Sequence, residues 1–214
     1  MHGNGSGRGM VVNQVERKER ICKGDWRTMT GLQEERTRFL KREECVLVLI
    51  DIQERLVPAM AGRDELLENT SRLVRFAGIV GIPVICTEQV KLGSTRSELL
   101  QALAGICVIE KSHFNCFRER EFTQAVEKAH RPALILAGIE AHICVWQTAA
   151  SGLASHRVQV VSDATASRSR QNKETALERM RAAGVVITTT EMLIYEILQR
   201  GGTDEFKAVL KLVK

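Results

Sequence analysis

Three side chains with complementary chemistry lie at or just beyond the ends of short apolar segments. Asp51 closes VLVLID, Lys111 follows CVIE, and Cys144 comes six residues after Gly138, the last residue of ALILAG. A buried carboxylate can take the proton of a thiol, and the thiolate can then attack a carbonyl carbon. A nearby ammonium group can hold the carboxylate ionised. An acid, an amine and a thiol are therefore the parts of a nucleophilic hydrolase, provided that the fold brings them together.

Cys144 has further support from its position along the chain. Residues 138–143 are predicted to form a strand-to-helix turn, so Cys144 falls in the first turn of a helix. The free N–H groups and the positive dipole end there favour a thiolate and can face a developing oxyanion. Each of the three residues also has a structural interpretation, as a turn cap, a solvated lysine or a packed thiol. From position alone the catalytic site is a hypothesis.

The elements that must position these residues alternate between two kinds of segment. Short apolar runs predict strands, over 45–51, 83–87, 107–110, 133–138, 157–161 and 185–189. Helical periodicity lies between them, over 63–80, 96–104, 119–130, 143–155, 171–183 and 190–200, with a last helix near 203–213. This alternation predicts a three-layer α-β-α sandwich with a six-stranded parallel sheet, a doubly wound, Rossmann-like α/β fold. In such folds ligands bind beyond the carboxyl ends of the strands, where all three reactive residues are expected.

Length and composition exclude several classes of protein. The chain has 214 residues, of which 44% are hydrophobic and 27% charged, as in one soluble domain. It has no uninterrupted apolar stretch of about 18 residues to span a membrane. The formal net charge is +5, but residues 1–28 carry six basic and three acidic side chains. The remainder lacks the clustered basic and aromatic residues of a nucleic-acid surface. We predict a small-molecule substrate and neither a nucleic-acid nor a membrane partner.

The N-terminal part differs from the rest in composition. Residues 1–28 are rich in glycine and charge, and we predict a disordered leader there, a lead-in segment over 29–44 and one domain over 45–214. The first residues lack the apolar stretch of a secretory signal, so a cytoplasmic location is expected.

The six cysteines do not form a recognisable framework. They stand at positions 22, 45, 86, 107, 116 and 144, with no CxxC pair. A zinc knuckle or a thioredoxin-like redox site is therefore not indicated. Packing is the expected role of all of them except Cys144.

From Cys45 to the C-terminus the chain resembles the isochorismatase-like cysteine hydrolases. The matching segments are VLVLIDIQERLVPAM (46–60), the TEQ and KLG motifs (87–93), IEKSHFNCF (109–117) and GIEAHICVWQT (138–148). The resemblance implies the isochorismatase-like hydrolase fold, with Asp51, Lys111 and Cys144 as the catalytic triad. It also implies a homo-oligomer, a dimer or tetramer, for which the helices over 190–214 could supply the interface.

The resemblance implies further site residues. A cis peptide bond is expected at Ile139–Glu140, which would aim the Glu140 N–H, with that of Cys144, at the oxyanion. For the Glu140 side chain we favour a role in the cap of the helix N-terminus. Three residues are candidates for substrate binding, with packing as the alternative for each: Gln53, Phe114 and Phe117.

Departures from related enzymes narrow the chemistry. Nicotinamidases resemble this fold but bind a metal through an Asp-x-His step and a further His. The five histidines of this chain, at 2, 113, 130, 142 and 156, share no ligand spacing, so no metal and no cofactor is expected. Isochorismatases that cleave a vinyl ether do not depend on a cysteine, so Cys144 favours an amidase-like branch.

The sequence thus predicts a cysteine-dependent hydrolase of a small amide or related C–N bond, acting through a thioester. Two alternatives stay open: vinyl-ether hydrolysis of the isochorismatase kind, and a non-catalytic scaffold or binding protein on the same fold.

Overall fold

A computed structural model describes residues 38–100, 102, 106 and 108–213 of the chain. The chain divides into two units between Arg38 and Phe39, and the fold described here is that of the second unit, Phe39–Lys214. The predicted leader over 1–28 and most of the lead-in segment lie outside the described residues.

Six parallel strands form one sheet, in the order β3-β2-β1-β4-β5-β6. The strands are β1 (Cys45–Ile50), β2 (Val84–Gln89), β3 (Val108–Lys111), β4 (Ala133–Ile139), β5 (Arg157–Ala166) and β6 (Val186–Thr188). The chain moves outward from β1 to one edge, then returns to β4 and moves to the other edge. This is the predicted doubly wound α/β fold, and each predicted strand corresponds to one of the six.

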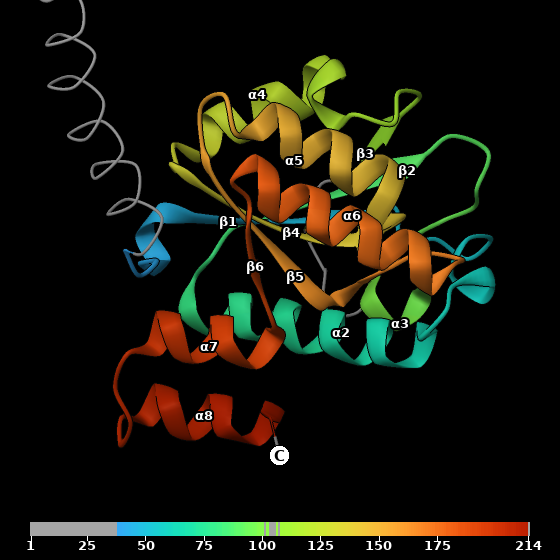
Figure 1. Cartoon of the computed structure of the whole chain (residues 1–214). Helices are drawn as coiled ribbons and strands as arrows, with labels where there is room; N and C mark the ends of the chain where they lie inside the picture. The colour runs from blue at the N-terminus through green and yellow to red at the C-terminus, as the bar shows by residue number, and fades with distance from the viewer. Residues whose placement is uncertain (1–37, 101, 103–105, 107, 214) are drawn as a thin grey trace, which may run out of the picture. The chain divides into compact units, whose positions relative to one another are not determined.

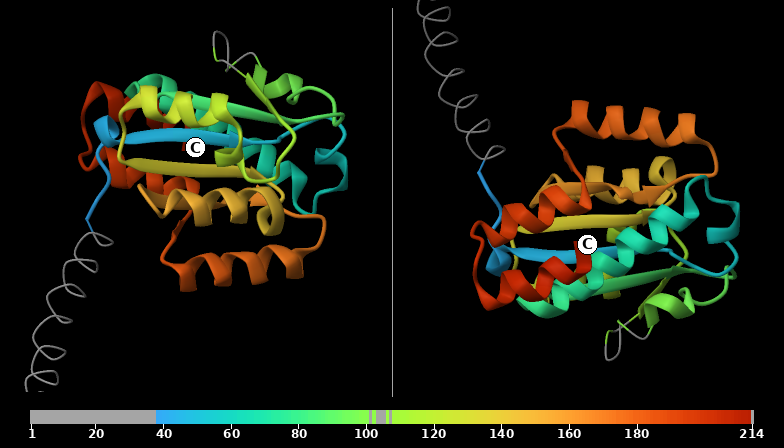
Figure 2. Two further views of the ribbon diagram at one scale, coloured as in Figure 1. Left: turned by 90° about the horizontal axis from the view of Figure 1, so that it is seen from above. Right: turned by 90° about the horizontal axis from the view of Figure 1, so that it is seen from below.

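Helices cover both faces of the sheet (Figures 1 and 2). One layer contains α2 (Arg63–Val80), α7 (Thr190–Leu198) and α8 (Asp204–Val213), and the other contains α4 (Arg120–Ala129), α5 (Trp146–Gly152) and α6 (Arg170–Ala183). The short α3 (Ser97–Leu100) lies between β2 and β3 in the chain.

Strand β1 shows why the sequence requires two layers. All six of its residues are buried. Leu47 and Leu49 belong to the core cluster beneath α2 and α7, whereas Val46 and Val48 belong to the cluster beneath α4 and α5. Because successive side chains of a strand point to opposite faces, an uninterrupted apolar strand must be covered on both sides.

Two helices differ from the prediction. The helix expected over 96–104 is described only as α3, and residues 101 and 103–105 lie outside the described part. The helix expected over 143–155 begins earlier, as the π-helical turn η4 (Ala141–Val145), and α5 ends at Gly152. The turn is wide because the carbonyl oxygen of Glu140 accepts hydrogen bonds from Ile143 N (3.0 Å) and Val145 N (3.2 Å).

The end of the lead-in segment packs on the C-terminal helices. Leu40 is fully buried, and its N–H donates to the Glu196 carboxylate at 2.8 Å. The Arg42 guanidinium donates to both carboxylate oxygens of Glu205, at 2.5 and 2.7 Å. None of the described helices is long and apolar enough to cross a membrane.

Candidate active site

A close approach of two central strands builds the edge of the sheet where the site lies. Gly138 of β4 pairs with Ile50 of β1 and has a φ of 127°. A Cβ atom at Gly138 would lie 2.1 Å from the carbonyl oxygen of Ile50, so only glycine fits there. The residues that follow each strand, Asp51 and the turn leading to Cys144, are thereby brought side by side at the point where the strand order reverses.

Asp51 is fully buried directly after β1 and has a φ of 55°. Its N–H donates to the carbonyl oxygen of Thr87 at 3.1 Å, and the Thr87 hydroxyl donates to Asp51 Oδ1 at 2.9 Å. Thr87 on β2 therefore fixes both the backbone and the carboxylate of Asp51.

Lys111 is the last residue of β3, and 1% of it is exposed. Its Nζ lies 2.7 Å from Asp51 Oδ2 in an ion pair, and 3.6 Å from Cys144 Sγ. The structure thus brings together the three side chains that the sequence singles out. In the chain, Lys111 lies 60 positions after Asp51 and 33 positions before Cys144. A buried lysine requires such partners, because an unpaired charge is strongly disfavoured in the interior.

Cys144 lies in the turn η4, and its residue is 6% exposed. The peptide bond between Ile139 and Glu140 is cis, at the position that the family resemblance implies. Glu140 occupies the N-cap position of η4, as expected, but its carboxylate makes no capping hydrogen bond to that turn. It instead accepts hydrogen bonds from Arg168 N (3.0 Å) and Nε (3.1 Å), which tie the turn to the loop after β5.

Burial dominates the protonation of the thiol. It raises the pKa of Cys144 to about 12; the charge of Asp51 adds to this effect and that of Lys111 opposes it. The expectation that a helix start favours a thiolate is therefore outweighed by desolvation, and the resting group is a neutral thiol.

The two charged residues respond to burial differently. Burial raises the pKa of the Asp51 carboxyl above its ordinary value, and the Lys111 charge opposes this. For Lys111 burial acts to lower the pKa, but the charges of Asp51 and Cys144 outweigh it and the pKa is raised. Lys111 is therefore the permanently charged member of the cluster at neutral pH.

Gln89 is a neighbour of this cluster that our reasoning from sequence missed. It ends β2, and its side-chain oxygen accepts a hydrogen bond from Lys111 Nζ at 2.6 Å. The signal was present, because Thr87 and Gln89 are both in the TEQ motif and a parallel neighbour of β3 must bring one of its residues beside Lys111.

Gln53, a candidate for substrate binding, makes its described hydrogen bonds to the main chain. Its side-chain nitrogen donates to the carbonyl oxygens of Gln89 (2.9 Å) and Gly93 (2.6 Å), and its oxygen accepts from Gln89 N (2.9 Å). It clamps the end of β2 to the loop that follows. A contact with substrate stays a prediction.

The two candidate phenylalanines differ in exposure. Phe114 is 53% exposed in the loop after β3. Phe117 is half-buried, with its ring edge-on to Phe122 at a centroid distance of 5.2 Å. Phe117 thus packs in the core beneath α4, and its contact with substrate, like that of Phe114, stays a prediction.

The other described cysteines are buried free thiols. Burial raises the pKa of Cys45 to about 12 and those of Cys86 and Cys116 to about 11. Cys22 and Cys107 lie outside the described residues.

Within the described part of the chain, no three His, Cys, Asp or Glu side chains are arranged to hold a metal ion. His142, near the thiol in sequence, instead forms hydrogen bonds with Ser167 Oγ at 3.0 Å and Asn172 Nδ2 at 3.4 Å.

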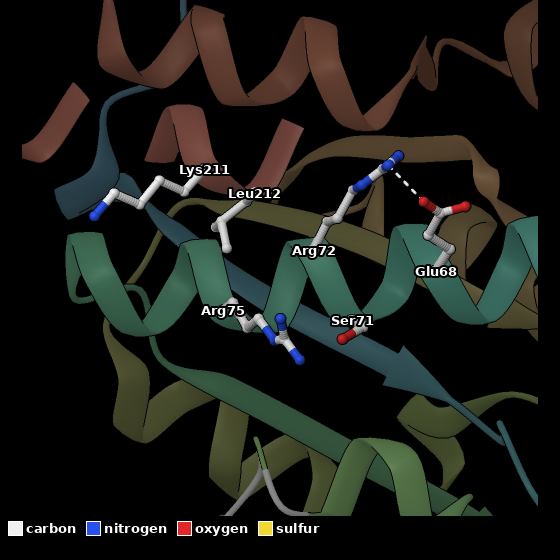
Figure 3. Close-up of a pocket in the computed structure, with 6 residues that line it drawn as sticks. All are labelled: Glu68, Ser71, Arg72, Arg75, Lys211 and Leu212. Atoms are coloured by element: carbon white, nitrogen blue, oxygen red, sulfur yellow. Dashed lines mark hydrogen bonds and ion pairs between the residues drawn. The ribbon is translucent and has the colours of Figure 1, made fainter. Parts of the chain in front are cut away.

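Two charged hollows lie along α2, and neither is lined by the reactive residues. The first, of about 310 Å³, is lined by residues of α2 and α8: Glu68, Ser71, Arg72, Arg75, Lys211 and Leu212 (Figure 3). The second, of about 330 Å³, adjoins it and includes Asp163 and Thr190. Arg72 is paired with Glu68 at 2.5 Å, so part of this charge is already neutralised.

Known proteins resemble this chain in sequence and in fold. Residues 45–192 match the isochorismatase domain model. A protein of Phytophthora sojae called secreted isochorismatase effector Isc1 is 34% identical over 176 residues, which cover 79% of this chain and 84% of that protein. Its name places it outside the cell, so a cytoplasmic location for this chain stays a prediction.

Solved structures agree with this assignment. A Caenorhabditis elegans structure described as the MAR1 ribonuclease is 32% identical and superposes with a TM-score of 0.77, covering 82% of this chain and 92% of that one. The Escherichia coli YcaC gene product, described as an octameric hydrolase of unknown specificity, is 22% identical with a TM-score of 0.77. The two chains are covered to 81% and 90%, and at this identity the likeness concerns the fold. The chain belongs to the isochorismatase-domain family of hydrolases.

Proposed function

We propose that the protein hydrolyses a small amide or a related C–N bond through a thioester on Cys144. The observation that carries this proposal is the buried cluster of three groups, in which Lys111 Nζ lies 2.7 Å from Asp51 Oδ2 and 3.6 Å from Cys144 Sγ. A thiol beside a carboxylate base, with a fixed positive charge next to both, is the arrangement that nucleophilic acyl transfer requires.

In the first half-reaction the Asp51 carboxylate takes the Sγ proton as the sulfur attacks the carbonyl carbon of the substrate. The raised pKa of Cys144 means that this proton leaves during attack, rather than beforehand. The oxygen gains negative charge, which the backbone N–H groups of Glu140 and Cys144 would stabilise. Collapse breaks the C–N bond, and protonated Asp51 returns its proton to the departing amine.

In the second half-reaction water attacks the thioester carbonyl while Asp51 again accepts a proton. Collapse releases the carboxylic acid and restores the thiol. The net change is addition of one water across the C–N bond. Lys111 stabilises the carboxylate and the transferred charge throughout, because its ammonium contacts both partners.

The first prediction concerns the nucleophile. Cys144→Ala is expected to lower kcat/KM on a responsive amide by at least about a thousandfold, because the variant lacks the sulfur on which the proposed thioester forms. Turnover would be measured on a panel of small amides and carbamoyl compounds, and intact mass of quenched wild-type enzyme should reveal the acyl adduct. Cys116→Ala, which removes a neighbouring buried thiol, is the matched control and should keep the adduct.

The same panel separates the other functions. Isochorismate turnover that survives Cys144→Ala would establish vinyl-ether hydrolysis instead, as the family name allows. Cleavage of RNA is tested because a similar structure is described as a ribonuclease. A protein that converts none of these substrates, and whose Cys144 forms no adduct with any electrophile, would favour the interpretation as a non-catalytic scaffold.

We further propose that the protein acts as a homo-oligomer, a dimer or larger. Met192 and Tyr195, three positions apart on α7, are 62% and 40% exposed, and the fold-related YcaC protein is described as octameric. Apolar side chains on one helix face are typical of a subunit interface.

A further inference from the structure

Gln89 contacts the cluster although the mechanism above gives it no step. It is paired in register with Lys111 at the ends of β2 and β3, so the two residues are direct lateral neighbours. Its Oε1 lies 2.6 Å from Lys111 Nζ, as close as the carboxylate of Asp51 at 2.7 Å. A neutral side chain thus holds the ammonium group as closely as the charged partner does.

The orientation of the Gln89 amide is fixed from several sides. Its Nε2 donates to the carbonyl oxygen of Ser112 at 2.8 Å, so the oxygen of the amide must face Lys111. The backbone of Gln89 is held by both ends of the Gln53 amide, at 2.9 Å each. Gln53 and Gln89 therefore form a support for Lys111 from the neighbouring strand β2.

The acceptors around Lys111 outnumber its protons. An ammonium group has three N–H donors. Four acceptors surround Nζ: Asp51 Oδ2 at 2.7 Å, Gln89 Oε1 at 2.6 Å, the His113 carbonyl oxygen at 3.2 Å and Cys144 Sγ at 3.6 Å. The hydrogen bonds of Nζ go to Gln89, His113 and the sulfur, whereas Asp51 Oδ2 is held as an ion pair, so Gln89 and the sulfur share the few donors of Lys111.

We propose that Gln89 is a positioning residue that holds one N–H of the Lys111 ammonium beside Asp51 and releases it to the Cys144 sulfur as the thiol proton leaves. This rests on the proposed function, in which Cys144 is the nucleophile. Because the Gln89 amide is neutral, the N–H of Lys111 that it accepts can turn to the developing charge on the sulfur. No buried charge is then left unpaired. A carboxylate in its place would not release the ammonium.

The titratable groups that face the thiol come from three elements. They are Asp51 after β1, Lys111 on β3 and Cys116 on η3 (Cys116–Arg118). Among the described side-chain contacts of Gln89, only the hydrogen bond with Lys111 connects it to one of these titratable groups. A change at Gln89 should therefore alter the thiol through Lys111.

The test compares two substitutions of similar size in the full chain. The rate of Cys144 alkylation by iodoacetamide is followed by peptide mass spectrometry against pH. Gln89→Glu adds a carboxylate that retains the ammonium, so the profile shifts to higher pH and alkylation at a given pH slows about tenfold. Gln89→Met removes the acceptor and frees an N–H for the sulfur, so the profile shifts to lower pH and alkylation speeds up. Amide turnover falls in both.

Opposite shifts are the signature of positioning through Lys111. A purely structural role would loosen the site in both variants and move both profiles in the same direction, and that result, or two unmoved profiles, overturns the proposal. So does a Gln89→Met protein that is alkylated no faster than wild type at neutral pH. Gln171→Glu, the same change at an exposed position of α6, should follow the wild-type curve.

The outcome is separable from that of the proposed function. Amide turnover that survives Cys144→Ala would refute the nucleophile, yet the alkylation profiles of the Gln89 variants would still report whether Gln89 positions Lys111. Thermal unfolding of each variant verifies that the fold is retained.

Discussion

Asp51 and Lys111 form an ion pair with both side chains fully buried. The Thr87 hydroxyl donates to Asp51 Oδ1 and the Gln89 amide oxygen accepts from Lys111, so each charged group also has a neutral polar partner. For the proposed reaction, in which Asp51 is the general base, the consequence is a carboxyl group of raised pKa, because desolvation raises the pKa of Asp51 and Lys111 only partly offsets it.

This raised pKa predicts the pH dependence of the reaction. The base must be ionised to act, so kcat/KM should fall as the pH drops through the pKa of Asp51, at a pH above the 3.8 of an ordinary aspartate. The pKa of Lys111 is raised above 10.5, so this residue causes no loss of rate on the alkaline side up to about pH 10. Initial rates between about pH 4 and pH 10 test for the acid limb and for the absence of a loss caused by Lys111 on the alkaline side.

A matched variant isolates the role of this carboxyl group. Asp204→Asn removes an exposed carboxylate and should leave the acid limb unchanged, whereas Asp51→Asn should abolish turnover. An acid limb at or below the ordinary value would contradict the assignment of Asp51 as the base.

At the scale of elements, the contact between β1 and β4 determines whether the site exists. Asp51 follows one strand and the turn to Cys144 follows the other, so their separation depends on how closely the strand ends approach. Gly138 permits that approach, because every other residue would carry a Cβ atom into the carbonyl oxygen of Ile50.

Gly138→Ala is therefore expected to destabilise the fold by more than about 3 kcal/mol, from the positive φ and the steric overlap together. Gly78→Ala is the control, because Gly78 is exposed in α2 with nothing within 4 Å of its added Cβ. That change should stabilise the helix by about 0.5–1 kcal/mol. Urea unfolding measures both, and equal effects of the two substitutions would show that the strand contact is not limiting.

The elements also mark where prediction from sequence succeeds. Short apolar runs identify all six strands, since a strand that is covered on both faces consists mainly of apolar residues. The extension of β5 to Ala166 was missed because Ser162 and Asp163 interrupt its apolar run. The π-helical turn was missed because it depends on one carbonyl oxygen, that of Glu140, accepting two hydrogen bonds.

Within the site, residue type and position were enough to select Asp51, Lys111 and Cys144. The thiol's protonation was not predictable, because it depends on how much water the final packing excludes. The TEQ motif makes Gln89 a candidate neighbour of Lys111, but which residue of the motif lies beside Lys111 depends on the register of β2 and β3, which the sequence does not determine.

At the scale of the whole molecule, the exposed face of α7 is the feature that a monomer leaves unexplained. Met192 and Tyr195 are accessible there, and the ring of Tyr195 lies 6.4 Å from that of Phe206 on α8. The C-terminal helices thus present an apolar surface on the layer that does not carry the thiol.

We expect sedimentation to give a mass of a dimer or larger. The double substitution Met192→Glu and Tyr195→Glu should lower that mass, because it places charge within the interface. Ile79→Glu, at a 39% exposed position of α2, is the control and should leave the mass unchanged. A monomeric wild-type protein, or a double variant with unaltered mass, would refute the interface.

The buried ion pair also bears on how this family can lose activity over evolutionary time. Removing either Asp51 or Lys111 alone strands a charge in the interior, a change of about 3–5 kcal/mol against the fold. Replacing Cys144 has no comparable cost in stability, because a neutral thiol can be replaced by another small side chain. Relatives that have lost the proposed activity should therefore lack the thiol and still contain the ion pair. If Cys144 is the nucleophile as proposed, its loss, and not the loss of either charged residue, would mark a relative that no longer hydrolyses amides.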